Sequence, residues 1–139
     1  MPTTSCIFCK IVSGEEPSVQ LYADHHTIAF MDKYPANDGH CLVIPRTHYE
    51  TVFEMPPEEF AAVARTVVKI AAGVQRGLQP DGLNLVQANG PIAGQSVMHV
   101  HVHVLPRRQD DNLLINWSRL EEGDRARIAE LAGRIRAQL

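Results

Sequence analysis

Short apolar or β-branched stretches separated by polar residues dominate the first third of the chain. Segments 18–23, 27–32 and 41–46 (SVQLYA, TIAFMD and CLVIPR) are apolar or β-branched, and they are separated by Asp, His, Pro, Asn and Gly, which are typical of turns. Two similar segments follow at 82–89 (GLNLVQAN) and 97–105 (VMHVHVHVL). We therefore predict five strands, the first three arranged as a meander.

A period of 3.6 residues appears in two longer segments. After two prolines, a helix is predicted over 57–78, with Glu58 and Glu59 in its first turn. The members of its apolar stripe are Phe60, Val63, Val67, Ile70, Val74 and Leu78. The tail from Asp124 predicts a closing helix, whose apolar side carries Ile128, Leu131, Ile135 and Leu139.

The order of these elements, βββαββα with short connections, predicts an α+β fold: a five-stranded antiparallel sheet with one long helix and a C-terminal helix. The chain has 139 residues, 45% hydrophobic and 21% charged, which suits one domain over 1–139, with the weakest pattern in the tail 109–139. No apolar run approaches the roughly 20 residues that cross a bilayer, and the N-terminus lacks the features of a signal peptide. We expect a cytoplasmic protein with no membrane partner. A net charge of −3, with scattered Lys and Arg, argues against polymeric nucleic acid as a partner.

The segment at 97–105 places three histidines on alternate positions. Because successive side chains of a strand point to opposite faces, His99, His101 and His103 share one face, and the valines between them share the other, which can pack against the long helix. An ordinary core would leave the donor and the acceptor of each imidazole without partners. Three interpretations follow: a solvent-facing polar row, metal ligation through a His-x-His pair, or phosphate chemistry with imidazoles as nucleophile and acid.

The cysteines suggest a second kind of site. Cys41 lies among apolar residues and is predicted to be a buried packing thiol, whereas Cys6 and Cys9 form a C-x-x-C pair. This spacing suits zinc, although it also occurs by chance and in redox pairs. His48, after the third strand, and His99, at the start of the fifth, could complete a tetrahedral set. The predicted ligands of a structural zinc ion are Cys6, Cys9, His48 and His99.

The sequence HVHVHVL is similar to the H-φ-H-φ-H-φ-φ signature of the histidine triad (HIT) superfamily of nucleotide hydrolases and transferases. Segments IFCKI, IAFMD, GHCLVIPRTH and LVQANG resemble the Hint branch of that family, in the same order and at nearly the same spacing. HVHVHVLPR and NGPIAGQS also resemble the Fhit branch, which cleaves diadenosine polyphosphates. The resemblance implies the HIT fold and a homodimer, for which segments 57–78 and 82–89 would supply an apolar contact.

The resemblance also implies roles for individual residues. His101 would be the nucleophile that attacks the α-phosphate of a purine nucleotide, and His103 would bind the α-phosphate oxygens. His40 matches the family's fourth histidine, which supports a proton relay behind the nucleophile, and Ser96 would reach the phosphate or the leaving group. The implied nucleotide-binding residues are Asp32 at the ribose hydroxyls, Asn89 and Gln95 as further donors, and Ile7, Phe8, Ile11 and Phe30 as walls of the base pocket.

The expected activity is cleavage of a phosphoramidate or similar bond at the α-phosphate, with release of a nucleoside monophosphate and no cofactor in the chemistry. The alternatives are a diadenosine polyphosphate hydrolase or phosphorylase, and a nucleotide-binding protein with little turnover. Two features depart from the family pattern. Lys33 stands where Hint proteins usually have an apolar residue, and the tail beyond Arg108 matches neither branch closely. In that tail, Trp117 is expected either to contact the leaving group or to pack.

Overall fold

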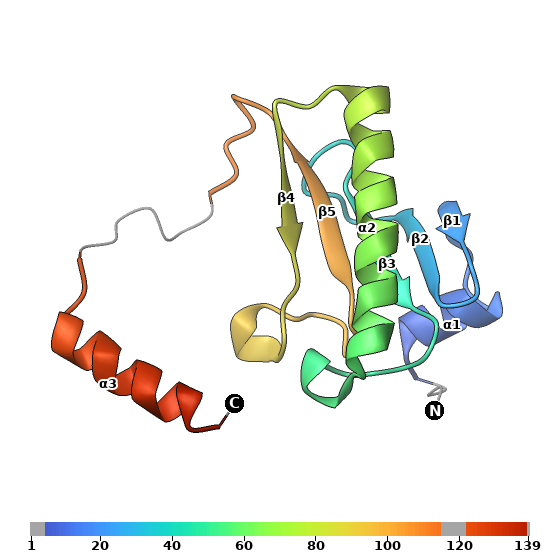
Figure 1. Cartoon of the computed structure of the whole chain (residues 1–139). Coiled ribbons are helices and arrows are strands. Elements are labelled where there is room, and N and C mark those ends of the chain that lie inside the picture. The colour runs from blue at the N-terminus through green and yellow to red at the C-terminus, as the bar shows by residue number, and fades with distance from the viewer. Residues whose placement is uncertain (1–4, 115–121, 139) are drawn as a thin grey trace.

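The computed structural model describes residues 5–114 and 122–138, whose arrangement is shown in Figure 1. Five strands among these residues form one antiparallel sheet in the order β1-β2-β3-β5-β4. Their bounds are Gln20–Ala23 (β1), Thr27–Met31 (β2), Cys41–Pro45 (β3), Gly82–Val86 (β4) and Val102–Arg107 (β5). The predicted α+β fold is confirmed, and β1 to β3 form the predicted meander.

Helix α2 (Pro57–Leu78) crosses one face of the sheet (Figure 1). The prediction for its bounds is confirmed, and the triad's intervening valines are buried beneath it. The stripe is wrong at its ends, where Phe60 and Leu78 are 36% and 48% exposed. A helix of 22 residues is about 33 Å long, whereas the strands it covers are about 17–20 Å long. The buried side chains of α2 are Ala62, Val63, Thr66, Val67, Ile70 and Val74.

Strand β5 begins later than the sequence pattern predicts. The prediction placed its start at residue 97, but regular pairing starts at Val102. The backbone of the preceding residues forms hydrogen bonds with a loop and not with a neighbouring strand: the N–H of Val100 donates to the carbonyl of Tyr49 at 2.7 Å. His99 and His101 are therefore held by an irregular segment at the start of β5.

The opposite face of the sheet carries a short helix that the sequence analysis did not predict. Helix α1 (Ile7–Ser13) has Cys6 as its N-cap, and Sγ of Cys6 accepts the backbone N–H of Cys9 at 3.4 Å. Gly14, with φ of +85°, is the C-cap. Phe8 of α1 packs into an apolar cluster on this face. The buried members of the cluster are Phe8, Ile28, Phe30, Leu42 and Ile44. Because His103 pairs with Leu42, the histidine face and the α1 face are the same.

Helix α3 (Arg125–Arg136) confirms the predicted C-terminal helix, and the side chain of Asp124 caps it by accepting two backbone N–H groups. The prediction that it closes the domain is wrong for the described residues, because none of its side chains is buried. Its described stripe is narrow, and Ile128 and Ile135 are 56% and 62% exposed. Trp117 lies outside the described residues. No helix in the described part of the chain is long and apolar enough to cross a membrane.

Candidate active site and metal cluster

The triad histidines are less exposed to solvent than a polar surface row would be. His99 is fully buried, His101 is 4% exposed and His103 is half-buried. Burial lowers the pKa of all three imidazoles, to about 4 for His99 and for His103. The three rings are therefore neutral near pH 7, and each offers one N–H donor and one lone pair. The interpretation as a polar surface row is wrong for His99 and His101.

The hydrogen bond of His101 fixes which of its nitrogens carries the proton. Nδ1 of His101 lies 2.8 Å from the carbonyl oxygen of His99, and a carbonyl can only accept, so Nδ1 carries the hydrogen. The lone pair of the neutral ring is then on Nε2, which has no hydrogen bond to any of the described residues. The Phe8 ring stands edge-on to the His101 ring, with centroids 5.1 Å apart, and limits its rotation.

A chain of hydrogen bonds runs through His40 to His103. The backbone N–H of Ala36 donates to Nδ1 of His40 at 3.0 Å, so the ring hydrogen of His40 is on Nε2. That Nε2–H lies 2.9 Å from Nδ1 of His103 and 3.4 Å from Oδ2 of Asp32. His103 accepts at Nδ1 and therefore carries its hydrogen on Nε2. These contacts explain the proximity of Asp32, His40 and His103 without a metal ion, although their ligand atoms also lie within 4.8 Å of one another.

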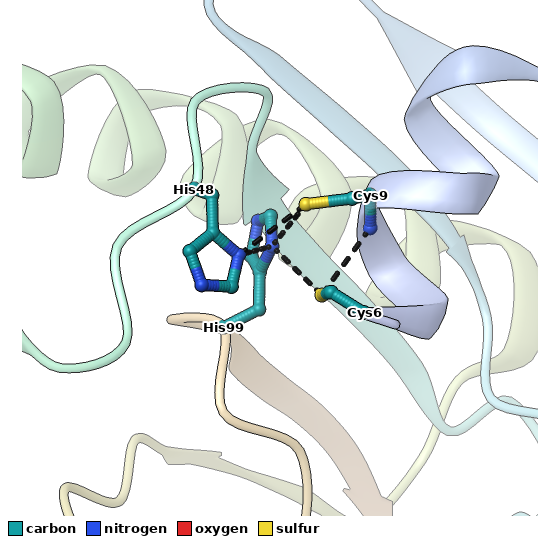
Figure 2. Close-up of side chains that lie close together, drawn as sticks. All are labelled: Cys6, Cys9, His48 and His99. Carbon is teal, nitrogen blue, oxygen red and sulfur yellow. Dashed lines mark hydrogen bonds between the residues drawn. The ribbon is translucent and has the colours of Figure 1, made fainter. Parts of the chain in front are cut away.

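The four predicted metal ligands come together at the N-terminus of α1 (Figure 2). Cys6 is the N-cap of α1 and Cys9 lies in that helix, whereas His48 belongs to the loop after β3 and His99 to the segment before β5. Sγ of Cys9 lies 3.3 Å from Nδ1 of His48 and 3.6 Å from Nδ1 of His99, and Sγ of Cys6 lies 3.5 Å from Nδ1 of His99. The two Nδ1 atoms are 3.1 Å apart.

The three sulfur–nitrogen separations fit a tetrahedral ion, and the two Nδ1 atoms lie slightly closer together than its ligands would. With Zn–N bonds of about 2.0–2.1 Å and Zn–S bonds of about 2.3 Å, neighbouring ligand atoms of a tetrahedron lie about 3.3–3.8 Å apart. His99 is also prepared as a ligand, because its Nε2 donates to the carbonyl of Pro45 at 2.8 Å and leaves a lone pair on Nδ1. The residues present thus fit a closed Cys₂His₂ centre.

The predicted base-pocket residues lie on the histidine face. Phe8 and Phe30 are buried, with ring centroids 5.5 Å apart, whereas Ile7 is 39% exposed and Ile11 is half-buried beside them. Phe8 links this apolar wall to the His101 ring. Cys9, in the same helix, and the N-cap Cys6 connect this wall to the predicted metal ligands.

The loop residues predicted from the family resemblance surround the triad's N-terminal end. Ser96 is exposed just before the triad. Gln95 is buried, and both donors of its amide are used, on the carbonyls of Glu50 (2.6 Å) and Val97 (3.0 Å). Asn89 accepts the backbone N–H of Val52 at 2.8 Å. The amides of Gln95 and Asn89 thus fix the loop's conformation, and their contact with a nucleotide stays a prediction.

Two predicted features have simple outcomes. Asp32 accepts the backbone N–H of Tyr34 at 2.8 Å, so it stabilises a turn and also faces His40. Cys41 is fully buried, as predicted, and burial raises the pKa of its thiol to about 11.

A hollow of about 370 Å³ lies beside Ser96 and the predicted metal ligands, and the sequence analysis did not predict it. Glu50 contributes the only carboxylate among the described residues that line this hollow. No spacing rule could have found Glu50, because its place depends on the loop after β3.

Comparison with known proteins defines the class. The family model for the HIT domain matches residues 13–110. Protein hit of Bacillus subtilis is 46% identical over 103 residues, covering 74% of this chain and 71% of that protein. Adenosine 5'-monophosphoramidase HNT1 of Saccharomyces cerevisiae is 35% identical over 136 residues, covering 97% and 83%. The chain belongs to the HIT family.

Solved structures agree with this assignment. The crystal structure of a HIT family member from Bacillus subtilis superposes with a TM-score of 0.91 at 36% identity and covers 97% of both chains. A histidine triad family protein from Mycobacterium smegmatis, described as Zn-bound, superposes with a TM-score of 0.75 at 37% identity, covering 94% of this chain and 97% of that one. The fold described above is thus the fold of solved HIT proteins.

Proposed function

We propose that the protein is a nucleotide hydrolase that cleaves a phosphoramidate or similar bond at the α-phosphate of a purine nucleotide. The observation that carries the proposal is the hydrogen bond from His101 Nδ1 to the carbonyl of His99, which directs a free lone pair from Nε2. A neutral imidazole is a competent nucleophile near pH 7, whereas a hydroxyl would need an added base. The names of relatives support the reaction class, since one is an adenosine 5'-monophosphoramidase and another an adenylylsulfatase.

The reaction has two displacements at the same phosphorus. In the first, Nε2 of His101 forms a bond to the α-phosphorus, the bond to the leaving group breaks, and the leaving group departs with a proton taken up from solvent. In the second, water attacks the phosphorus, the N–P bond breaks, and the nucleoside monophosphate is released while the proton lost by the water returns to solvent. His101 is then neutral again. Both steps pass through a phosphorane-like state with extra negative charge on the phosphate oxygens.

The neighbouring donors can stabilise that charge. Nε2–H of His103 is free to donate to an α-phosphate oxygen, and the contact from His40 holds its tautomer in the required state. Ser96 provides a hydroxyl on the leaving-group side. Asp32 can accept hydrogen bonds from the ribose hydroxyls. The wall of Phe8 and Phe30, with Ile7 and Ile11, can receive a flat base.

The proposal includes a structural zinc ion at Cys6, Cys9, His48 and His99. A closed site with four protein ligands has no open position, so such an ion would supply stability and no chemistry. Its role would be to hold α1, and with it Phe8, against the segment that carries His101. Three observations support this assignment: the Cys₂His₂ donor set, the unprotonated Nδ1 of His99 and the Zn-bound relative.

We also propose a homodimer. Strand β4 lies at one edge of the sheet, and its Leu85 and Val86 are 53% and 38% exposed. On α2, Val68 is 68% exposed. Exposed apolar side chains on adjacent elements suit a two-fold contact between copies.

The test of the reaction is the covalent intermediate. Intact-mass spectrometry of protein quenched during turnover should show a nucleotidyl adduct, and peptide mapping should place it on His101. Replacement His101→Ala should lower kcat by several decades, and added imidazole should restore part of the activity of His101→Gly. His25→Ala, which changes an exposed turn residue, is the matched control. A wild-type rate in His101→Ala would contradict the nucleophile. Faster turnover of diadenosine polyphosphates would favour the alternative substrate, and tight binding without turnover would favour the binding protein.

A further inference from the structure

A hollow of about 370 Å³ lies beside the proposed reaction centre. Ser96 lines it, together with Cys6 and His48 of the proposed metal cluster. Ile7, next to the Phe8 wall that touches His101, also faces it. The hollow thus borders Ser96, which the proposed function places on the leaving-group side, and it shares Ile7 with the proposed nucleotide pocket.

The lining of this hollow is mixed, because Ser5, Cys6, His48, Glu50 and Ser96 add polar groups to an aliphatic part. Ile7, Val97 and Met98 supply aliphatic surface, and Met98 is 36% exposed. Glu50 is the only carboxylate among the described lining residues, and none of those residues is Lys or Arg. Two thiolates and a divalent ion in the proposed cluster would have no net charge. The hollow therefore combines an aliphatic part, several neutral polar groups and a single carboxylate.

The position of Glu50 is tied to the loop that carries Ser96. Nε2 of Gln95 donates to the backbone carbonyl of Glu50 at 2.6 Å and to that of Val97 at 3.0 Å. Oε1 of Gln95 accepts the backbone N–H of Gly90 at 2.7 Å, and Gln95 is 5% exposed. One buried amide thus joins the backbone of Glu50 to both ends of the loop around Ser96.

We propose that this hollow is the leaving-group subsite and that Glu50 selects aliphatic amine leaving groups that carry a second, positively charged group. The inference rests on the proposed function and specifies its substrate class. In the first displacement the P–N bond breaks and the amine departs with a proton, while its alkyl chain contacts Ile7, Val97 and Met98 and its distal ammonium faces Glu50. Anionic leaving groups, such as phosphate or sulfate, meet repulsion from the same carboxylate. Because Glu50 is exposed, the preference is modest.

The experiment compares two substrates that differ only in the distal group. Adenosine 5'-phosphoramidates of 1,4-diaminobutane and of pentylamine have the same number of heavy atoms, but only the first carries an ammonium. The ratio of kcat/KM for the cationic to the neutral substrate should be about two- to fivefold higher in the wild type than in Glu50→Gln. It should fall further in Glu50→Lys. Glu58→Gln, which removes an exposed carboxylate at the start of α2 outside the hollow, is the matched control and should keep the wild-type ratio.

A binding measurement separates this inference from the reaction itself. The same two compounds are titrated by calorimetry into His101→Ala with and without Glu50→Gln. A ratio of dissociation constants that depends on Glu50 supports the subsite even if the wild type hydrolyses neither compound, a result that would overturn the proposed reaction alone. Equal ratios with and without Glu50, in turnover or in binding, would overturn the subsite and leave the nucleophile assignment intact.

Discussion

Replacement of Cys9 by Ser tests the proposed link between the Cys₂His₂ cluster and the proposed nucleotide pocket. The change removes one of the four predicted ligands, because a hydroxyl neither ionises like a thiol nor reaches as far toward an ion at the centre of the cluster. Sγ of Cys9 is the ligand atom that lies within 3.6 Å of both histidine nitrogens of the cluster. Its loss should therefore open the site on the side where α1 meets His48 and His99.

The expected loss of stability follows from mass action. A ligand that binds only the folded state adds about 2.7 kcal/mol at 100 times its dissociation constant and about 4.1 kcal/mol at 1,000 times. If the loss of one thiolate weakens the metal by two to three decades, Cys9→Ser should lower the free energy of unfolding by about 3–4 kcal/mol. For a domain of this size that corresponds to a fall in Tm of about 10–15 °C.

The kinetic effect should be indirect. Phe8 lies in α1 between the rings of His101 and Phe30, so a looser α1 should raise KM more than it lowers kcat. Metal content by elemental analysis, Tm by calorimetry with and without added zinc, and steady-state kinetics provide the three readouts. Cys41→Ala, which removes a buried thiol outside the cluster, should keep the metal. Wild-type protein purified without chelators and free of metal, or a Cys9→Ser protein that keeps one equivalent and its Tm, would refute the reasoning.

Two further predictions concern pH and assembly. Burial would raise the pKa of Asp24, but hydrogen bonds from the backbone of His26 and Thr27 and from the hydroxyl of Tyr22 outweigh it and lower the pKa to about 2. The folded-state pKa is below the unfolded value near 3.9, so the stability that Asp24 contributes is present above about pH 4 and lost as pH falls to about 2. Urea unfolding should show Asp24→Asn less stable than wild type by about 1 kcal/mol at pH 7, with the difference closing near pH 2; a constant difference would exclude the ionic contribution. Light scattering at micromolar concentration should give twice the chain mass of 15.4 kDa, Leu85→Lys should shift it toward the monomer, and a wild-type mass near 15 kDa would contradict the dimer.

Periodicity predicted those elements whose apolar side faces a large surface. Helix α2 and strands β2 and β3 follow their patterns because most of their apolar side chains are buried in the core between the sheet and the helices. Helix α1 escaped prediction because it has only seven residues, too few for a reliable period, and because its N-cap is Cys6, an atypical capping residue. The start of β5 was misplaced because Val100 bonds to the carbonyl of Tyr49 in a loop, a contact that alternation cannot reveal.

The candidate site was predictable to different depths. Residue types and spacing suggested the four metal ligands, and the fold brings Cys6 and Cys9 to His48 and His99 as expected. The tautomers of His40 and His101 depend on the backbone groups that face them, Ala36 N–H and the His99 carbonyl, and no sequence pattern specifies those contacts. Glu50 could not be predicted for the same reason.

His99 contacts the cysteines through its side chain and His101 through its backbone. Its imidazole faces the cysteines, whereas its backbone carbonyl accepts the hydrogen of His101. A carbonyl is present whatever the side chain, so the contact that orients His101 does not require a histidine at position 99. Loss of the proposed ion and its thiol ligands would therefore leave the contact that orients His101 in place, provided that other packing holds α1. A homologue that lacks the C-x-x-C pair but keeps the last two histidines of the triad is expected to retain the proposed reaction.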